Sequence, residues 1–294
     1  MYKLSIGICT YNRVDIILNC VEAILTSVSN SRFVIGEDVE LIVVDNKSTD
    51  KTGEILKSSD YFSKGLFKYI FESNQGLSNA RNRFLDESQG ELLLFLDDDA
   101  ILCNGCVDAY IDAVTDNPSV DFFGGMVCEE SFEGKPKWFD ENFHMAYSIL
   151  NLGSSVCKFP KKIGPIGANF MVRRKAITKI RFRTDLGRVG GSLLSGEETD
   201  FLIKSGYSHD NSLYVGNASV VHCFSRERYT KTWAIQRFKL NGKSDWYMRT
   251  GLKGKLTGLL SQVYHALASV KSLNYFYIQC RLYSLIYFCI SSIK

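Results

Sequence analysis

The sequence lacks several patterns that would place it in a large functional class. It contains no G-x-G-x-x-G and no G-x-x-x-x-G-K-[ST] motif, so a dinucleotide-binding or a P-loop protein loses its main support. The formal net charge of the 294 residues is only +3, so we expect no nucleic-acid partner. Internal repeats and low-complexity tracts are also absent. A hydrophobic share of 45% with 23% charged residues is typical of a globular chain.

No secretory leader is recognisable, because the opening MYKLSIGICTYNR runs directly into a predicted strand. Nine cysteines, an odd number, are spread between Cys9 and Cys289, and reduced thiols in the cytoplasm are the simplest interpretation. Cys103 and Cys106 form one C-x-x-C pair, but no second pair or adjacent histidine completes a zinc site. We therefore expect a cytoplasmic protein without structural zinc.

The N-terminal part of the chain alternates apolar runs with helix-like patterns. A helix is predicted after Asp15, which is expected to cap it, and another over residues 76–88. Continuous apolar runs predict strands at 4–9, 41–44, 67–71 and 92–96. Such strands separated by helices are typical of a parallel sheet covered on both faces, and these sheets bind ligands beyond the carboxyl ends of their strands.

The regular alternation ends near Asp121. Strands are predicted at 122–128, 169–173 and 213–221, separated by long irregular stretches, so this half is expected to be more antiparallel and to shape a second substrate site. The last forty residues are rich in Leu, Tyr, Ile and Phe. Gln279 and Arg281 lie inside their most apolar stretch, which disfavours a transmembrane span. A helix at a membrane surface and a helical hairpin packed on the domain or in a dimer both stay open.

The most specific chemical signal is Asp97-Asp98-Asp99, directly after the strand LLLFL. Three adjacent carboxylates repel one another unless a cation or hydrogen-bond donors meet them. Oxygen ligands of this kind suit Mg²⁺ or Mn²⁺. Alternate strand positions share a face, so Asp97 and Asp99 are expected to point together and Asp98 elsewhere.

Two further polar segments follow strands. Asp45 ends the second strand, where an acidic residue is placed to bind a ribose or a base edge, although a turn is the plainer interpretation. Asp50, a little further on, is predicted to cap a helix. After the first strand, residues 10–13 (Thr10, Tyr11, Asn12 and Arg13) offer polar groups and one aromatic ring suited to flank a base and a pyrophosphate.

Taken in order, these segments resemble glycosyltransferase family 2, the inverting enzymes with the GT-A fold. The similarity runs through SIGICTYNR, ELIVVDNKSTD, NQGLSNARN, LLLFLDDDA, GANFMVRRKA and SGEETDF, over roughly residues 4–222. It implies an α/β fold with a mostly parallel, Rossmann-like nucleotide-binding sheet. The implied domains are a GT-A domain over 1–225, with a nucleotide-sugar half at 1–120 and an acceptor half at 121–225, and a helical extension over 226–294.

The resemblance also implies roles for single residues. Asp45 would bind the nucleoside, with Thr10 and Asn12 in the same pocket. Arg81, from the block that begins at Asn74, would approach the nucleotide or its phosphates. The nucleotide-sugar site would thus contain Thr10, Tyr11, Asn12, Arg13, Asp45, Asn74, Arg81, Asp97 and Asp98. Asp97 and Asp99 match the ends of the family's DxD motif, with Asp99 as the direct ligand of Mn²⁺ or Mg²⁺ and Asp98 facing the ribose.

The pair Glu197-Glu198 matches the acidic pair of the family, whose second member is commonly the catalytic base. Glu198 is therefore the predicted base, with Glu197 as the other candidate, because the family usually has Asp at the second position. Asp200 is interpreted as a charge favourable to a helix N-terminus. His222 is predicted as a further metal or diphosphate contact, with a structural role as the alternative, and Arg226 or Arg228 as a contact of the leaving diphosphate.

The implied reaction is a single displacement from a nucleotide-sugar donor to a hydroxyl of a glycan or lipid-linked acceptor in bacterial surface polysaccharide synthesis. A UDP-sugar is the most frequent donor in the family. The apolar C-terminus favours a place on the inner face of the cell membrane, while the oligomeric state stays open. Alternatives are a nucleotidyltransferase, which would need a glycine-rich loop after the first strand, and a non-catalytic scaffold that binds nucleotide or membrane.

Overall fold

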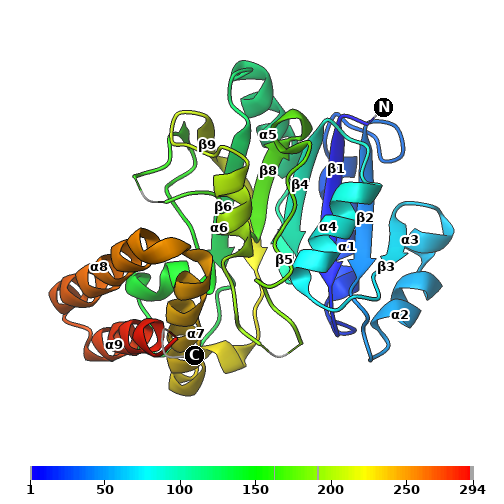
Figure 1. The fold of residues 1–294 in the computed structure, drawn as a ribbon. Helices are drawn as coiled ribbons and strands as arrows, with labels where there is room; N and C mark the ends of the chain where they lie inside the picture. The colour runs from blue at the N-terminus through cyan, green and yellow to red at the C-terminus, as the bar shows by residue number, and fades with distance from the viewer. Residues whose placement is uncertain (1, 162, 191, 292–294) are drawn as a thin grey trace.

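The computed structural model describes residues 2–161, 163–190 and 192–291 (Figure 1). Within them, nine strands form one mixed sheet in the order β3-β2-β1-β4-β8-β6-β9-β5, with β7 paired to β9. The strands are β1 (Leu4–Thr10), β2 (Val39–Asp45), β3 (Lys68–Phe71), β4 (Leu92–Asp97), β5 (Ala100–Leu102), β6 (Phe122–Glu129), β7 (Val156–Cys157), β8 (Asn169–Arg173) and β9 (Ser212–His222).

The first half of the sheet is parallel, as predicted. β1 lies between β2 and β4, and their register places Thr10 level with Asp45 and Cys9 level with Asp97. β1, β2 and β4 are buried along nearly their whole length, which explains why they read as continuous apolar runs. The polar segments that follow these strands therefore meet at one edge of the sheet.

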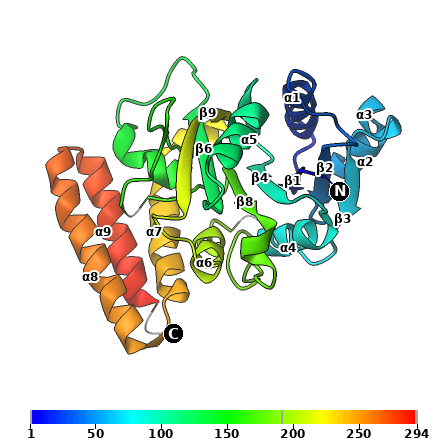
Figure 2. The same ribbon diagram turned by 90° about the horizontal axis from the view of Figure 1, so that it is seen from above.

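Helices cover both faces of the sheet (Figure 2). The α-helices are α1 (Ile17–Ser29), α2 (Thr52–Ser58), α3 (Asp60–Ser63), α4 (Leu77–Glu87), α5 (Cys106–Asp116), α6 (Glu197–Lys204), α7 (Lys231–Met248), α8 (Gly251–Ser269) and α9 (Tyr275–Ile290). The 3₁₀ helices are η1 (Glu141–Tyr147), η2 (Arg174–Ile177), η3 (Arg226–Tyr229) and η4 (Val270–Ser272). One apolar core joins the sheet to α1 and α5, and a second joins it to α4 and α6.

Neither aspartate that was predicted to cap a helix occupies an N-cap position. The prediction that Asp15 caps α1 is wrong, because Ile16 occupies the N-cap position and no side chain caps the helix. Instead, the backbone N–H groups of Ile16 and Ile17 donate to the carbonyl of Arg13, so a turn replaces the cap. The N-cap of α2 is Lys51, and Asp50, one residue earlier, accepts the backbone N–H of Thr52 at 2.9 Å through its Oδ1.

The second half of the sheet is mixed, as predicted. β8 is antiparallel to both β4 and β6, while β6 and β9 are parallel with a register shift between Gly125 and Met126. A Cβ at Gly125 would lie 1.9 Å from the carbonyl oxygen of Ala218, so the shift depends on this glycine. The short strand β5, which the sequence analysis did not predict, then pairs with β9 and sets Ala100 level with His222.

The C-terminal helices form a separate layer at one end of the molecule (Figures 1 and 2). α9 packs on α7, where a Cβ at Gly242 would lie 2.0 Å from the carbonyl oxygen of Ser284, and α8 packs on α9. A core of aromatic residues, including Phe143, Phe238 and Tyr277, joins these helices to η1. Packing of the hairpin on the domain is thus confirmed. Among the described residues, no helix is long and apolar enough to cross a membrane.

Candidate functional site

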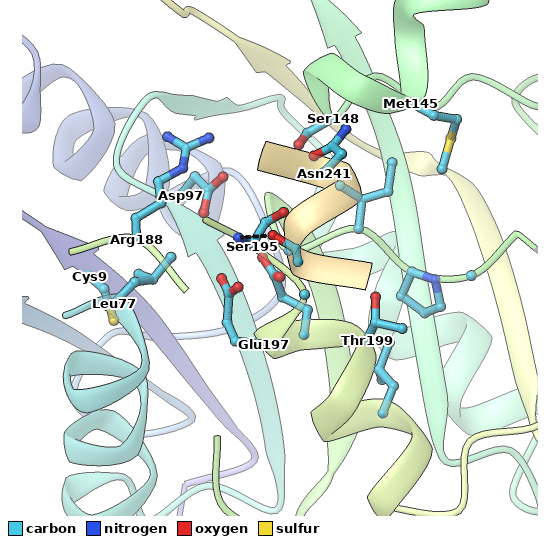
Figure 3. A pocket seen from close by; sticks show the side chains of 18 of the residues that line it. Cys9, Leu77, Asp97, Met145, Ser148, Arg188, Ser195, Glu197, Thr199 and Asn241 are labelled. Carbon is cyan, nitrogen blue, oxygen red and sulfur yellow. Dashed lines mark hydrogen bonds between the residues drawn. The ribbon is translucent and has the colours of Figure 1, made fainter. Parts of the chain in front are cut away.

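A cavity of about 880 Å³ opens at the carboxyl edge of the parallel strands, between that edge and helices α6 and α7 (Figure 3). Most of the residues predicted from the sequence line it. They are Thr10, Tyr11, Asn12, Arg13, Asp97, Asp98, Asp99, Glu197 and Glu198. The other predicted residues, Asp45, Asn74, Arg81, His222, Arg226 and Arg228, lie behind the lining or away from it.

The guanidinium of Arg81 lies at the base of the cavity and is almost fully buried. It projects from α4 and contacts three carboxylates. Its NH1 lies 3.0 Å from Glu197 Oε1 and 2.9 Å from Glu198 Oε1, and its NH2 lies 3.3 Å from Asp97 Oδ1. Burial alone would lower the pKa of Arg81, but these carboxylates raise it above its ordinary value. Arg81 therefore stays charged and connects β4 with α6.

The two glutamates at the start of α6 occupy different environments. Glu197 is buried, and burial together with the charge of Glu198 raises its pKa to about 8. The side chain of Glu198 is 24% exposed, and although burial opposes ionisation, Arg81 lowers its pKa. At neutral pH the pair thus consists of a protonated Glu197 and an ionised Glu198. Both glutamates line the cavity, and Glu198 is the more exposed of the two.

Gly167 makes room for this arrangement. It lies in the segment before β8, and a Cβ at this position would lie 2.1 Å from Oε1 of Glu198 and 2.9 Å from NH2 of Arg81. The segment before β8 thus contributes to the site by leaving space at Gly167, because any larger side chain there would displace the carboxylate of Glu198.

The aspartates after β4 are held by a second set of cations. Arg13 contacts Asp98 at 3.2 Å and Asp99 at 3.5 Å, and Arg228 donates to Asp99 Oδ2 at 3.0 Å. Burial raises the pKa of Asp98 to about 6. Burial would do the same to Asp99, but His222 and Arg228 beside it bring its pKa well below the usual range. Asp99 is therefore an anion at any physiological pH.

Asp97, Asp99 and His222 form a group of side chains that could hold a divalent cation. One ligand atom from each lies within 4.8 Å of the others. His222 is buried and neither ring nitrogen has a hydrogen-bond partner among the described residues, although Nε2 lies 2.9 Å from Asp99 Oδ1. Apart from this contact with Asp99, the buried imidazole has no partner there, and a cation held by the two aspartates would take one of its nitrogens as a ligand. Asp97 and Asp99 share the cluster, while Asp98 lies outside it and contacts Arg13.

The opposite end of the cavity is built by the segments after β1 and β2. Asp45 is buried, and its carboxylate accepts the hydroxyl of Tyr69 at 2.7 Å and the backbone N–H of Ser48 at 2.9 Å. Asn12, at φ 53°, accepts the backbone N–H of Thr49 and so holds the loop after β2. The side chain of Thr10 is buried at the cavity, and its hydroxyl beside Asp98 lowers the pKa of that carboxyl, against the larger effect of burial.

The neighbouring Asn46 was not predicted from the sequence, yet it lines the cavity. Its side chain joins the loop after β2 to the start of α4. The amide nitrogen donates to the carbonyl of Asn74 at 2.8 Å, and the amide oxygen accepts from the backbone N–H of Gly76 at 2.6 Å. Asn74 thus contributes its backbone to this end of the site.

Two arginines of the cavity wall were also missed in the sequence. Arg188 points into the cavity on the side of Asp97 (Figure 3). No carboxylate lies within ion-pair distance of Arg188 in the part of the chain that the structure describes. Arg237 on α7 is buried, and burial together with the charge of Arg188 lowers its pKa to about 10. Both lie outside any recognisable motif, so only the fold brings them here.

The remaining predicted arginine faces elsewhere. Arg226 is exposed, stacks over Phe132 at 5.1 Å and lines a separate shallow depression with Asp15 and Glu130. Among the described residues, the arginines that line the cavity are Arg13, Arg188 and Arg237. Apolar side chains line its outer part, among them Met145, Ile163, Pro165, Ile203 and Met248.

Comparisons with known proteins point to one family. Residues 5–181 match the family model described as "Glycosyl transferase family 2". A glucosyl-dolichyl phosphate glucuronosyltransferase from Haloferax volcanii is 22% identical over 82% of this chain and 76% of its own length. A GalNAc(5)-diNAcBac-PP-undecaprenol beta-1,3-glucosyltransferase from Campylobacter jejuni is 30% identical over 44% of this chain, which covers only 40% of that relative.

Two solved structures have a similar fold. The mannosyltransferase PcManGT from Pyrobaculum calidifontis, in complex with GDP-Man and Mn²⁺, aligns with a TM-score of 0.64 at 15% identity, over 99% of this chain and 87% of its own. Residues 1–349 of S. aureus TarS, in complex with UDP-GlcNAc, align with a TM-score of 0.58 at 15% identity, over 97% and 89%. These likenesses confirm the predicted α/β fold of the GT-A class.

The proton on Glu197 generates a prediction about stability. The pKa of Glu197 rises from 4.5 to about 8 on folding, so the folded protein binds a proton that the unfolded chain has lost. Stability from this group is present below pH 4.5 and is lost as the pH rises toward 8. Glu197→Gln mimics the protonated side chain. We expect this variant to fold. Its melting temperature should fall less between pH 5 and 8 than that of the wild type.

Thermal unfolding across this pH range checks the assignment, with Glu198→Gln as the matched control. Glu198 is ionised in the folded protein, so its replacement removes a partner of Arg81 and should destabilise the protein at neutral pH. If Glu197→Gln unfolds at lower temperature than Glu198→Gln at pH 7, the proton is on the other glutamate.

Proposed function

The chain belongs to glycosyl transferase family 2, and we propose that it is an inverting, metal-dependent enzyme that uses a nucleotide-sugar donor. The acceptor in this proposal is a hydroxyl of a glycan or a lipid-linked sugar. One observation supports the proposal most directly. Asp97 and Asp99, which cluster with His222, border the same cavity as Glu198, and Arg81 contacts both Asp97 and Glu198.

The parallel-sheet end of the cavity would hold the donor. The nucleoside would lie between the segments after β1 and β2, near Thr10, Tyr11 and Asp45, and the diphosphate near the aspartates. A divalent metal held by Asp97, Asp99 and His222 would neutralise charge on the diphosphate. Arg188 and Arg13 carry guanidinium groups suited to phosphate oxygens. UDP-sugar is the proposed donor because that class is the most frequent in the family.

Arg81 takes a different role from the one that the resemblance implied. Its guanidinium already contacts Asp97, Glu197 and Glu198 and does not line the cavity. We therefore assign it to the positioning of carboxylates, while contact with phosphates passes to Arg188. Arg228, which contacts Asp99 directly, acts through that aspartate in the same way.

Glu198 would act as the general base. Its carboxylate is ionised, partly exposed to the cavity and fixed by one ion pair with Arg81. It would take the proton of the acceptor hydroxyl as that oxygen bonds to the anomeric carbon. The bond from this carbon to the diphosphate oxygen breaks at the same time, and the nucleoside diphosphate leaves with the electron pair. The hydroxyl would attack the anomeric carbon from the face opposite to the diphosphate. The configuration at this carbon would therefore invert, and no covalent enzyme intermediate is needed.

The acceptor half of the proposal concerns residues 121–225 and the helical extension at 226–294. The outer cavity wall has apolar side chains such as Met145, Ile163 and Met248, which suit a substrate that is not purely sugar. The names of the two curated relatives refer to dolichyl phosphate and PP-undecaprenol acceptors. We place the enzyme in bacterial surface polysaccharide synthesis, on the cytoplasmic face of the cell membrane.

The first test measures nucleoside diphosphate release from a panel of UDP- and GDP-sugars, with Mn²⁺ or Mg²⁺ and then with EDTA. We expect release from one donor class, abolished by EDTA and restored by excess metal, because slow transfer to water needs no acceptor. Release that is unaffected by EDTA would reject the metal requirement. Absence of both release and calorimetric donor binding would favour a non-catalytic scaffold.

The second test separates the base from its neighbour. Glu198→Ala and Asp99→Ala should abolish transfer, and Glu198→Gln should lower it by about 10²–10⁴-fold, the usual contribution of a positioned base. Glu197→Gln, which preserves a neutral side chain, should keep a measurable rate. Transfer at the wild-type rate in Glu198→Ala would contradict the assignment of Glu198 as the base, and the same result in Asp99→Ala would contradict the assignment of Asp99 as a metal ligand.

The third test compares two arginines. Arg188→Ala should raise the KM for the donor by about ten- to a hundredfold, the effect of losing a hydrogen bond to a charged group, and Arg188→Lys should restore part of the affinity. Arg226→Ala serves as the control, since Arg226 faces away from the cavity. If Arg226→Ala has the larger effect on KM, the sequence-based choice of Arg226 is right and Arg188 is not a diphosphate contact.

A further inference from the structure

α8 turns its apolar side chains toward solvent. Its large exposed residues are Leu252 (88% exposed), Leu256 (55%), Leu260 (61%), Val263 (36%) and Leu267 (68%). At 100° per residue these positions fall within an arc of about 80°. The opposite face, which packs on the protein, has the small or polar residues Gly258, Gln262, Ala266 and Ser269. This is the reverse of an ordinary surface helix, and such an exposed row marks an interaction surface.

The row continues past the end of α8. Val270 in η4 is 56% exposed, Leu273 in the turn to α9 is 82% exposed, and Tyr275, the first residue of α9, is 87% exposed. Tyr264, on the edge of the row, is 60% exposed. Both ribbon views place α8 in the outermost layer of the molecule, so the described chain does not cover it (Figures 1 and 2).

Charge in this part of the chain has one sign. Residues 246–294 contain no Asp or Glu, but they contain Arg249, Lys253, Lys255, Lys271, Arg281 and Lys294. Lys253 and Lys271 are exposed, and helical spacing puts both on the side of the leucines, one near each end of the row. An apolar strip with lysines at its ends matches the order of groups in a lipid interface, where acyl chains lie beneath anionic headgroups.

We infer that this face of α8 docks on an anionic lipid surface, with the helix lying in the plane of the membrane. The alternative occupant is a second copy of this chain. A symmetric contact through α8 would bring lysines of both copies together without any acidic partner in this segment, which is unfavourable. The inference deepens the proposed function, since an enzyme held in this way would reach a lipid-linked acceptor from the membrane surface.

The test measures co-sedimentation with vesicles of phosphatidylcholine alone and of phosphatidylcholine with phosphatidylglycerol. We expect the wild-type chain to bind the anionic vesicles more strongly and to be released by salt. Leu260→Glu/Leu267→Glu should weaken binding at least about tenfold, because it removes buried apolar area and adds repulsive charge. Lys253→Gln/Lys271→Gln should reduce the preference for anionic vesicles and leave the residual binding less sensitive to salt.

Val34→Glu/Phe62→Glu is the matched control, because these residues are 50% and 38% exposed at the other end of the molecule. It should bind vesicles as the wild type does. Equal binding by Leu260→Glu/Leu267→Glu and the wild type, or no vesicle binding at all, would overturn the inference. So would a dimer in light scattering that this double variant converts to a monomer. Nucleoside diphosphate release and calorimetric donor binding are measured in parallel without vesicles, and the absence of both with intact vesicle binding would reject the proposed function alone.

Discussion

The site depends on one buried cation. Arg81 projects from α4 under the cavity floor and contacts Asp97 at the end of β4 and both glutamates at the start of α6. Without a positive charge at this point, three carboxylates from segments a hundred residues apart could not share a buried edge, because each would lose its hydration and repel the others. The ion pairs thus fix α6 against the sheet and set the ionisation of Glu197 and Glu198 at the same time.

A second arrangement of the same kind surrounds Asp99. Arg13 comes from the segment after β1, His222 ends β9 and Arg228 lies in η3, so three distant parts of the chain converge on one carboxylate. The two sets of charges meet at Asp97 and Asp99, where the ligand cluster lies. Cations of the protein thus stabilise these acidic groups, while Arg188 has no carboxylate within ion-pair distance among the described residues.

The helical extension obeys a different physical constraint. Glycine and small residues let α7, α8 and α9 pack closely, as at Gly242 beside Ser284, and their leucines are left on the outside. Aromatic residues of η1, α7 and α9, by contrast, are buried together in one cluster. Within the described residues, the C-terminal helices thus expose a long apolar row, and none of them is long and apolar enough to cross a membrane.

The amino-acid pattern was enough to place the parallel strands and the edge where Thr10, Asp45 and Asp97 meet, because buried strands read as apolar runs and their polar ends follow directly. The order of the strands in the sheet came from the structure. The sequence also determined the acidic pair at 197–198 through motif order. Tertiary structure alone decided which glutamate is ionised, since that follows from Arg81, a residue far away in the chain. It likewise decided that Arg188 rather than Arg226 faces the cavity, and that the row on α8 points outward. Each of these depends on packing between distant segments, which local patterns do not record.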